Sequence, residues 1–219
     1  MPTPLAHRAL TGLYVILDPS VSQRRPLAGV LTDAIDAGAR LFQYRNKAAS
    51  MREAYAEALT LRALASDAGA VFIVNDRCDL ALAVNADGVH LGQHDLSFSY
   101  ARHIMGPERI IGLSTHNPIQ VREAEHLKPD YVGFGPIFRP VSKEDHDPLV
   151  GIEGLRQARS LTSLPVFAIG GIRVPHVEAI LATGVTGIAV VSAVLQAPDA
   201  KEAVRDFIKR MNGPGLRAV

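Results

Sequence analysis

Two aspartates stand where successive apolar runs end, and their carboxylates could bind a metal ion. Asp76 follows Val71-Phe72-Ile73-Val74, and Asp95 lies 19 positions later, after Gly88-Val89-His90-Leu91-Gly92. If the two runs are neighbouring parallel strands, one sheet edge gathers both carboxylates. Mg²⁺ prefers one or two carboxylates together with waters and phosphate oxygens. The alternative is that each aspartate only caps the helix that follows, since Asp is a favoured N-cap residue.

Polar and cationic side chains alternate with aromatic ones near residue 45. Strand side chains point to opposite faces in turn, so Gln43, Arg45 and Lys47 would share one face. Phe42 and Tyr44 would share the other face and pack under helices. Arg binds anions as a planar fork and Lys as a point charge, so we interpret the trio as an anion clamp. A solvated strand exit with ordinary surface charges is the alternative.

A second anion signal lies further along the chain. Gly170-Gly171 follows one apolar run, and Ser192 follows the next, after Val190-Val191. Glycines let the backbone approach a ligand closely, and free backbone N–H groups in such loops bind phosphate. Most Gly-Gly pairs are only turns, but the hydroxyl in the very next unit favours a phosphate site.

The sequence gives fewer signals for acid–base or nucleophilic chemistry than for metal and anion binding. His90 lies among apolar residues and His116 stands at the expected start of a helix, so we interpret both as structural. The sequence has no Cys/His metal cluster and no Gly-x-Ser-x-Gly motif. The polar stretch 139–151 carries Lys143, and long loops over an active site commonly act as lids.

Eight short β-branched runs must position these side chains. Their nearly continuous apolar character indicates parallel strands buried on both faces, and the stretches between them, such as 52–65, have helical spacing. Eight units in the chain give about 27 residues each, near the ~30 of a βαβ repeat. We therefore predict a single-domain (β/α)8 TIM barrel over 1–219, with an open doubly wound sheet as the alternative. The predicted strands are 13–18, 39–45, 71–75, 88–92, 110–115, 131–137, 165–171 and 187–193.

The amino-acid composition limits the classes of protein to which the chain can belong. The chain is 47% apolar and 21% charged, and its formal net charge of +1 gives no general field for nucleic acid or membrane. The single cysteine, Cys78, excludes an intramolecular disulfide and suits a reducing cytoplasm. Residues 1–10 lack the apolar core of a signal peptide and are expected to be a loose leader. We expect a soluble cytoplasmic protein with small-molecule substrates, and a homo-oligomer is compatible with the sequence.

In combination and order, six segments resemble those of the thiamine phosphate synthase family, and the resemblance spans about residues 13–210. It implies a (β/α)8 barrel that joins 4-amino-2-methyl-5-hydroxymethylpyrimidine diphosphate to a thiazole phosphate, releases diphosphate and uses Mg²⁺. The segments are Gln43-Tyr44-Arg45-Asn46-Lys47, Val74-Asn75-Asp76-Arg77, Ala86-Asp87-Gly88-Val89-His90-Leu91-Gly92-Gln93-His94-Asp95, Gly135-Pro136-Ile137-Phe138, Ile169-Gly170-Gly171-Ile172 and Val191-Ser192.

The resemblance also implies roles for individual residues. It makes Asp76 and Asp95 the Mg²⁺ ligands. The residues that would contact the pyrimidine and its diphosphate are Gln43, Arg45, Lys47, Asn75, Ser114, Ser142 and Lys143. Among these, the catalytic contacts would be Arg45, Lys47, Ser114 and Lys143. The residues that would contact the thiazole phosphate are Gly171, Val191 and Ser192.

The sequence departs from the family pattern at one place, and three other functions are alternatives to the synthase. The family usually shows Thr-x-Thr-Lys after the sixth strand, where this chain has Pro140-Val141-Ser142-Lys143. The similar thiazole tautomerase shares the barrel and phosphate loops but generally lacks the paired metal carboxylates, so Asp76 and Asp95 favour the synthase. A phosphosugar isomerase or epimerase would need an acid–base pair at strand ends. A ligand-binding regulator would show no turnover.

Overall fold

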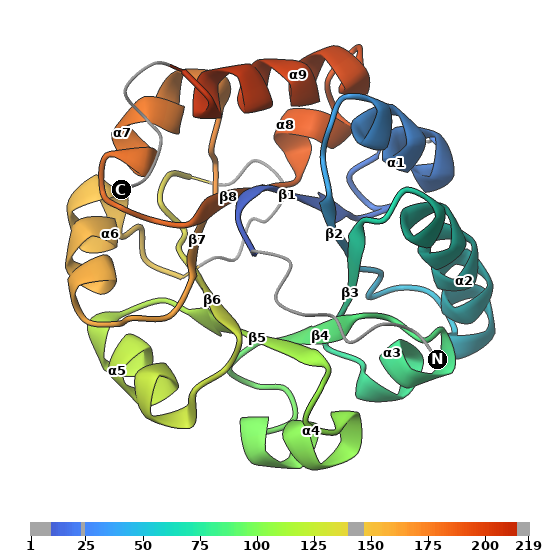
Figure 1. Cartoon of the computed structure of the whole chain (residues 1–219), viewed down its shortest axis with the longest axis horizontal. Helices are drawn as coiled ribbons and strands as arrows, with labels where there is room; N and C mark the ends of the chain where they lie inside the picture. Colours follow the sequence, from blue (N-terminus) through green and yellow to red (C-terminus); the bar gives the residue numbers. More distant parts are fainter. Residues whose placement is uncertain (1–9, 23–24, 140–146, 214–219) are drawn as a thin grey trace.

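The computed structural model describes residues 10–22, 25–139 and 147–213, and eight parallel strands close into a barrel in sequence order (Figure 1). Each strand pairs with its neighbours in the chain, and the last pairs with the first. The predicted (β/α)8 fold is therefore confirmed. The strands are β1 Gly12–Leu17, β2 Leu41–Tyr44, β3 Val71–Asn75, β4 Gly88–Leu91, β5 Ile110–Thr115, β6 Tyr131–Phe134, β7 Val166–Ile169 and β8 Gly187–Val190.

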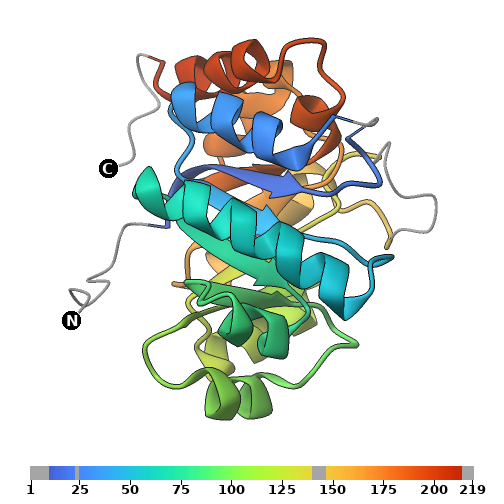
Figure 2. The ribbon, with the colours of Figure 1, turned by 90° about the vertical axis from the view of Figure 1, so that its right-hand side faces the viewer.

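Helices between the strands cover the outside of the barrel, and Figure 2 shows α1 and α2 side by side along its wall. The longest, α2, begins with a capping box in which Ser50 and Glu53 satisfy each other's backbone N–H groups. None of the helices in the described part of the chain is long and apolar enough to cross a membrane. The helices are α1 Leu27–Asp36, α2 Met51–Asp67, α3 Cys78–Ala83, α4 Phe98–Met105, α5 Pro118–Leu127, α6 Gly151–Ser160, η1 Val174–His176, α7 Val177–Leu181, α8 Ser192–Leu195 and α9 Ala200–Met211.

Several strands are shorter than the apolar runs predicted. The predicted strand 131–137 ends at Phe134, and Pro136 shortly beyond it has no N–H to continue the ladder. The predicted strand 187–193 ends at Val190, since Ser192 already begins α8. The site residues at these exits therefore lie on loops and helix starts. The expected leader, 1–10, lies outside the described residues except for its last position.

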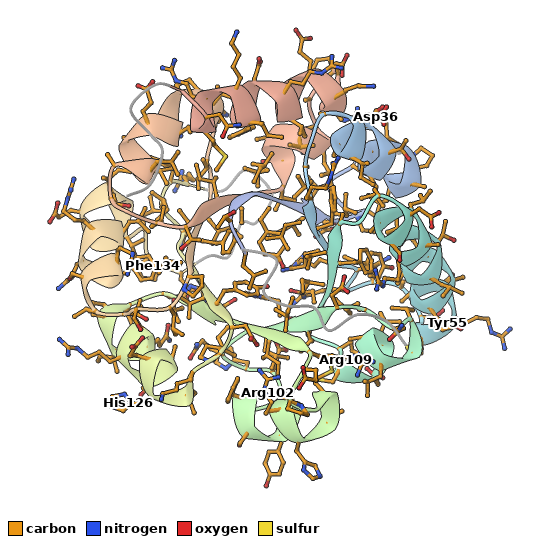
Figure 3. All side chains as sticks on the ribbon, in the orientation of Figure 1. Asp36, Tyr55, Arg102, Arg109, His126 and Phe134 are labelled. Atoms are coloured by element: carbon orange, nitrogen blue, oxygen red, sulfur yellow. The ribbon has the colours of Figure 1, made fainter. Side chains whose placement is uncertain are left out.

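The side chains form two apolar layers because strand residues alternate in direction. Tyr14, Tyr131 and Phe167 fill the barrel interior, whereas Phe42 and Phe134 pack between the strands and the helices. Figure 3 shows Phe134 in this outer layer, and it shows the labelled side chains of α2 and α5 pointing away from the barrel. The interior formed by the described residues is thus a core packed with side chains.

A glycine makes room for the largest interior ring. A Cβ on Gly112 would stand 2.1 Å from Cζ of Tyr131, while a Cβ on Gly29, at an exposed position of α1, would meet nothing within 4 Å. We expect Gly112→Ala to lower the free energy of unfolding by about 1–3 kcal/mol through overpacking. Gly29→Ala should raise it by up to about 1 kcal/mol, because Ala favours the helix. Urea unfolding of both variants measures the difference, and equal effects would contradict this view of Gly112.

Candidate active site

The carboxyl ends of the strands gather nearly all the residues predicted for the site. Those on β2–β5 and the loops after these strands are Gln43, Arg45, Lys47, Asn75, Asp76, Asp95 and Ser114. Those after β7 and β8 are Gly171, Val191 and Ser192. Ser142 and Lys143 lie outside the described residues. The residues of the two predicted anion sites thus lie at one barrel mouth, on an arc formed by the exits of β2–β5 and on an arc formed by the exits of β7 and β8.

Neither aspartate of the predicted metal pair caps a helix, so that alternative is wrong. Arg77 occupies the N-cap position of α3, and Ser97 occupies that of α4. Asp76 instead adopts a φ of 63°, and its backbone N–H donates to the carbonyl of His90 at 2.8 Å. Non-glycine residues rarely adopt this left-handed conformation, and such outliers cluster at functional sites.

Asp95 lies close enough to Asp76 to affect the protonation of Asp76. Burial and the hydrogen-bonding proximity of Asp95 raise the pKa of Asp76, and the Lys47 ammonium, 3.1 Å from its Oδ2, opposes this. The Oδ2 atom of Asp95 accepts from the Gly92 N–H at 2.7 Å. Two like charges held together favour a cation between them.

The donor set fits a cation that takes few protein ligands. Within the described ranges, no group of three or more His, Cys, Asp or Glu side chains could enclose a metal ion. Asp76 and Asp95 would therefore share the ion with waters and substrate oxygens. This is the coordination that Mg²⁺ prefers, since it dehydrates reluctantly and usually binds one or two carboxylates.

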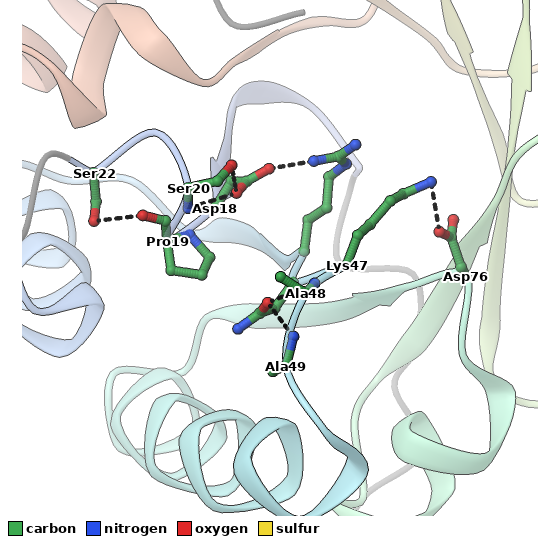
Figure 4. Close-up of polar contacts among 10 residues, drawn as sticks. Asp18, Pro19, Ser20, Ser22, Lys47, Ala48, Ala49 and Asp76 are labelled. Carbon is green, nitrogen blue, oxygen red and sulfur yellow. Dashed lines mark hydrogen bonds and ion pairs between the residues drawn. The ribbon is translucent and has the colours of Figure 1, made fainter.

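A buried carboxylate fixes Arg45, the first cation of the predicted clamp. Asp18 is only 3% exposed, and its Oδ1 accepts from the backbone N–H and the hydroxyl of Ser20 at 3.0 and 2.5 Å. Its other oxygen, Oδ2, forms an ion pair with Arg45 (Figure 4). The register that places Leu17 opposite Tyr44 brings Asp18 and Arg45, the next residue of each segment, together. Asp18 was not among the site residues predicted from the sequence, although a carboxylate ending the first apolar run was the available signal.

The second cation, Lys47, turns the other way, toward Asp76, as the dashed line in Figure 4 shows. Its side chain is 60% exposed. An open cleft of about 800 Å³ lies beside both cations, between the loops after β1 and β2 and helix α2. Arg45 and Lys47 therefore face an accessible space at the barrel mouth.

The predicted alternation in β2 is confirmed for the strand itself and does not continue past it. Phe42 and Tyr44 pack in the outer layer, and Gln43 points into the barrel, only 3% exposed. The strand ends at Tyr44, so the directions of Arg45 and Lys47 are set by their ion pairs. Gln43 donates through Nε2 to the hydroxyl of Tyr14 at 2.8 Å.

Ser114 projects from β5 beside a buried histidine. Its Oγ lies 2.9 Å from Nε2 of His90, and its carbonyl accepts from the Gln93 amide at 2.6 Å. Burial lowers the pKa of His90 to about 4, so the ring is neutral at pH 7. His90 was predicted to be structural, and its contact with Ser114 was not predicted, because nothing in an apolar run indicates what a single polar residue faces.

The two glycines after β7 leave space for a neighbouring loop to pack against them. Gly170 and Gly171 have φ values of 102° and 61°, and a Cβ on Gly171 would lie 2.5 Å from the carbonyl oxygen of Arg139. Glycine was predicted here because a ligand would approach the backbone closely. On the side where a Cβ would stand, it is the chain after β6 that approaches Gly171. The pairing of Ile169 with Ala189 places this turn next to the exit of β8.

The exit of β8 begins a short helix. Ser192 is the first residue of α8 and is half-buried, so its N–H has no carbonyl partner within the helix. Gly171 and Ser192 thus bring backbone donors and one hydroxyl to adjacent strand ends, as predicted.

These features define a (β/α)8 barrel whose mouth combines paired carboxylates, two cations and glycine-containing exits. The chain belongs to the thiamine monophosphate synthase family, because the family model matches residues 13–194. This covers more than half of the chain and includes every described site residue.

Named relatives are similar over nearly their whole length. The thiamine-phosphate synthase of Chloroflexus aurantiacus is 44% identical over 203 residues, which cover 93% of this chain and 94% of the relative. That of Moorella thermoacetica is 42% identical, with 92% and 97% covered. The solved structure of thiamine phosphate pyrophosphorylase from Pyrococcus furiosus has a TM-score of 0.83 and 40% identity, with 91% and 95% covered.

Proposed function

We propose that this protein is a thiamine phosphate synthase, a transferase of thiamine biosynthesis. It would join the pyrimidine diphosphate to a thiazole phosphate and release diphosphate. The relatives' names and the full-length similarity support the activity. The observation that carries it is the pairing of Asp76 and Asp95 at a mouth that also holds Arg45 and Lys47, because a diphosphate leaving group needs both a metal and cations.

The two anion sites would take the two substrates. Arg45, Lys47, Asn75 and Ser114 lie on the β2–β5 arc and would bind the pyrimidine diphosphate, with Gln43 beneath them. On the β7–β8 arc, the residues that would bind the thiazole phosphate are Gly171, Val191 and Ser192. The roles of Ser142 and Lys143 as further phosphate contacts rest on the family resemblance. This division holds the rings together between two fixed phosphate sites, which lowers the entropic barrier of the reaction.

Asp76 and Asp95 would hold the Mg²⁺. When bound, the ion neutralises charge on the diphosphate and so makes it a better leaving group. Lys47 lies within an ion-pair distance of Asp76, so it can contribute positive charge at the same place.

Cys78 is buried and free, and we infer a cytoplasmic location from this single thiol.

The chemistry would be dissociative. The bond between the pyrimidine methylene carbon and the diphosphate oxygen breaks first, and its electron pair leaves with the diphosphate. The ring amino group stabilises the resulting cation, and the thiazole nitrogen then attacks the carbon. Arg45, fixed by Asp18, stabilises the negative charge that grows on the leaving group. No protein base has to remove a proton, which agrees with the absence of an acid–base pair among these residues.

Incubation with both substrates and Mg²⁺ tests the proposal. We expect thiamine phosphate and diphosphate to appear in equal amounts, and no product when either substrate is omitted. The thiazole tautomerase alternative predicts a different result, namely isomerisation of the carboxylated thiazole phosphate without any pyrimidine. Absence of thiamine phosphate from reactions with folded protein would refute the synthase.

A further inference from the structure

Five polar side chains form one hydrogen-bonded chain across the barrel interior. Gln43 Nε2 lies 2.8 Å from the Tyr14 hydroxyl, which lies 2.8 Å from the Tyr131 hydroxyl. Tyr131 is in turn 3.0 Å from Nδ1 of His90, and Nε2 of His90 is 2.9 Å from Oγ of Ser114. The chain joins β2, β1, β6, β4 and β5, and its two ends are residues proposed to contact the pyrimidine substrate.

Counting donors gives this chain a direction. The Gln43 amide donates to Tyr14, so the single Tyr14 proton is left to donate to Tyr131. The Tyr131 proton must then go to Nδ1 of His90, which can accept only if its proton is on Nε2. That Nε2–H donates to Ser114. A charged ring is excluded by the same count, because Nδ1–H would then donate to Tyr131 as Tyr14 does, and the buried Tyr131 hydroxyl proton would have no acceptor left among these five side chains.

We propose that this chain makes Ser114 a one-way donor, whose hydroxyl proton is directed at the anionic pyrimidine diphosphate in the barrel mouth. Tyr14, Tyr131 and His90 act through Ser114 and are positioning residues. The inference rests on the proposed function for its substrate. A chain of opposite direction would turn the Ser114 proton toward His90 and present only lone pairs to the diphosphate, which would repel it.

The packing around the chain keeps its members in place. The Tyr131 ring stacks on His90 with centroids 5.4 Å apart, and it meets the rings of Tyr14 and Phe167 edge-on. Gly112 leaves the space that the Tyr131 ring occupies. Burial raises the pKa of both tyrosines, which keeps their hydroxyl protons available. Reversing the direction would leave the buried Tyr14 hydroxyl proton without an acceptor among these side chains, so the direction is stable.

The tautomer of His90 is a direct readout that needs no substrate. Nitrogen-15 spectroscopy of the full-length protein at neutral pH should show a neutral ring with its proton on Nε2, and His90→Gln identifies the signal by its loss. A proton on Nδ1 would overturn the inference. A protein that shows the Nε2 proton but makes no thiamine phosphate would refute the proposed function and leave the direction of the chain standing.

A matched pair of tyrosine variants tests the effect on catalysis. Tyr131→Phe removes one link, and we expect kcat/KM for the pyrimidine diphosphate to fall by about 10- to 100-fold, the value of one hydrogen bond to a charged group. Tyr44→Phe removes the hydroxyl of a tyrosine that is buried to the same extent as a residue but contacts Glu57 outside the barrel interior, and it should leave activity unchanged. Equal activity of the two variants, in an enzyme whose wild type is active, would overturn the inference.

A conservative replacement separates positioning from packing. The amide of His90→Gln can accept from Tyr131 and donate to Ser114, as the ring does, whereas His90→Leu fills similar space with no polar atom. We expect His90→Gln to retain at least ten times the kcat/KM of His90→Leu, with a similar urea midpoint. Equal losses in both variants would show that His90 acts only by filling the barrel.

Discussion

Replacing Asp76 or Asp95 with alanine is expected to reduce turnover by about 100-fold or more while the barrel remains folded. Each change removes one of two carboxylates proposed to hold Mg²⁺, and a bound metal contributes several kcal/mol to leaving-group stabilisation. Both residues lie at the open end of the barrel, away from the apolar core. Turnover measured over a range of Mg²⁺ concentrations, together with urea unfolding, checks both parts.

Asp79 provides the matched control, because it lies three positions from Asp76 and its carboxylate pairs with Arg77. Asp79→Ala should leave turnover and its Mg²⁺ dependence unchanged. A chelator in excess should stop the wild-type reaction, because two carboxylates without a metal repel the diphosphate. Full activity in the chelator would contradict the assignment of both aspartates.

Replacing Arg45 with glutamine is expected to lower kcat by about 10²- to 10³-fold, the usual effect of losing a preorganised donor to transition-state charge. Diphosphate charge grows as the C–O bond breaks, so the loss should fall on the chemical step. Ser192→Ala should instead raise KM for the thiazole phosphate by roughly tenfold, since its contact is the same before and during reaction. Steady-state kinetics with each substrate varied in turn separates the two effects.

Arg210 supplies the control for a lost cation, because it pairs with Glu178 on the outer helices at 3.1 Å. Arg210→Gln should match the wild type in both parameters. If Arg45→Gln and Ser192→Ala changed the same constants for both substrates, two separate phosphate sites would be ruled out.

Much of the fold was predictable because burial on both faces of a parallel sheet leaves a clear pattern in the sequence. Val71–Asn75 and Ile110–Thr115 begin and end where their apolar runs do. The aspartates were predictable for a related reason, since a charge directly after such a run must lie at a strand end. Ser192 shows the limit of this reasoning, because an apolar run does not reveal where a strand gives way to a helix.

The interior polar chain could not be predicted from local pattern. Tyr14, His90 and Tyr131 each look like one more member of an apolar run. They meet only because closing the barrel brings β1, β4 and β6 around one axis, and register across several strands decides which residues face each other. Asp18 also ends an apolar run, but its pairing with Arg45 could not be predicted, because it depends on the register between β1 and β2.

The two cations on the loop after β2 differ in how much freedom they lose when a ligand binds. Arg45 is held by a buried carboxylate that is itself fixed by Ser20, so its side chain is already ordered. Lys47 is mostly exposed, so its ion pair with Asp76 is weak and its side chain keeps more of its rotamers. A free side chain of either type carries about 2 kcal/mol of rotamer entropy. Arg45 has lost much of this on folding, so under the proposed function it would set the position of a phosphate, and Lys47 would adapt to it.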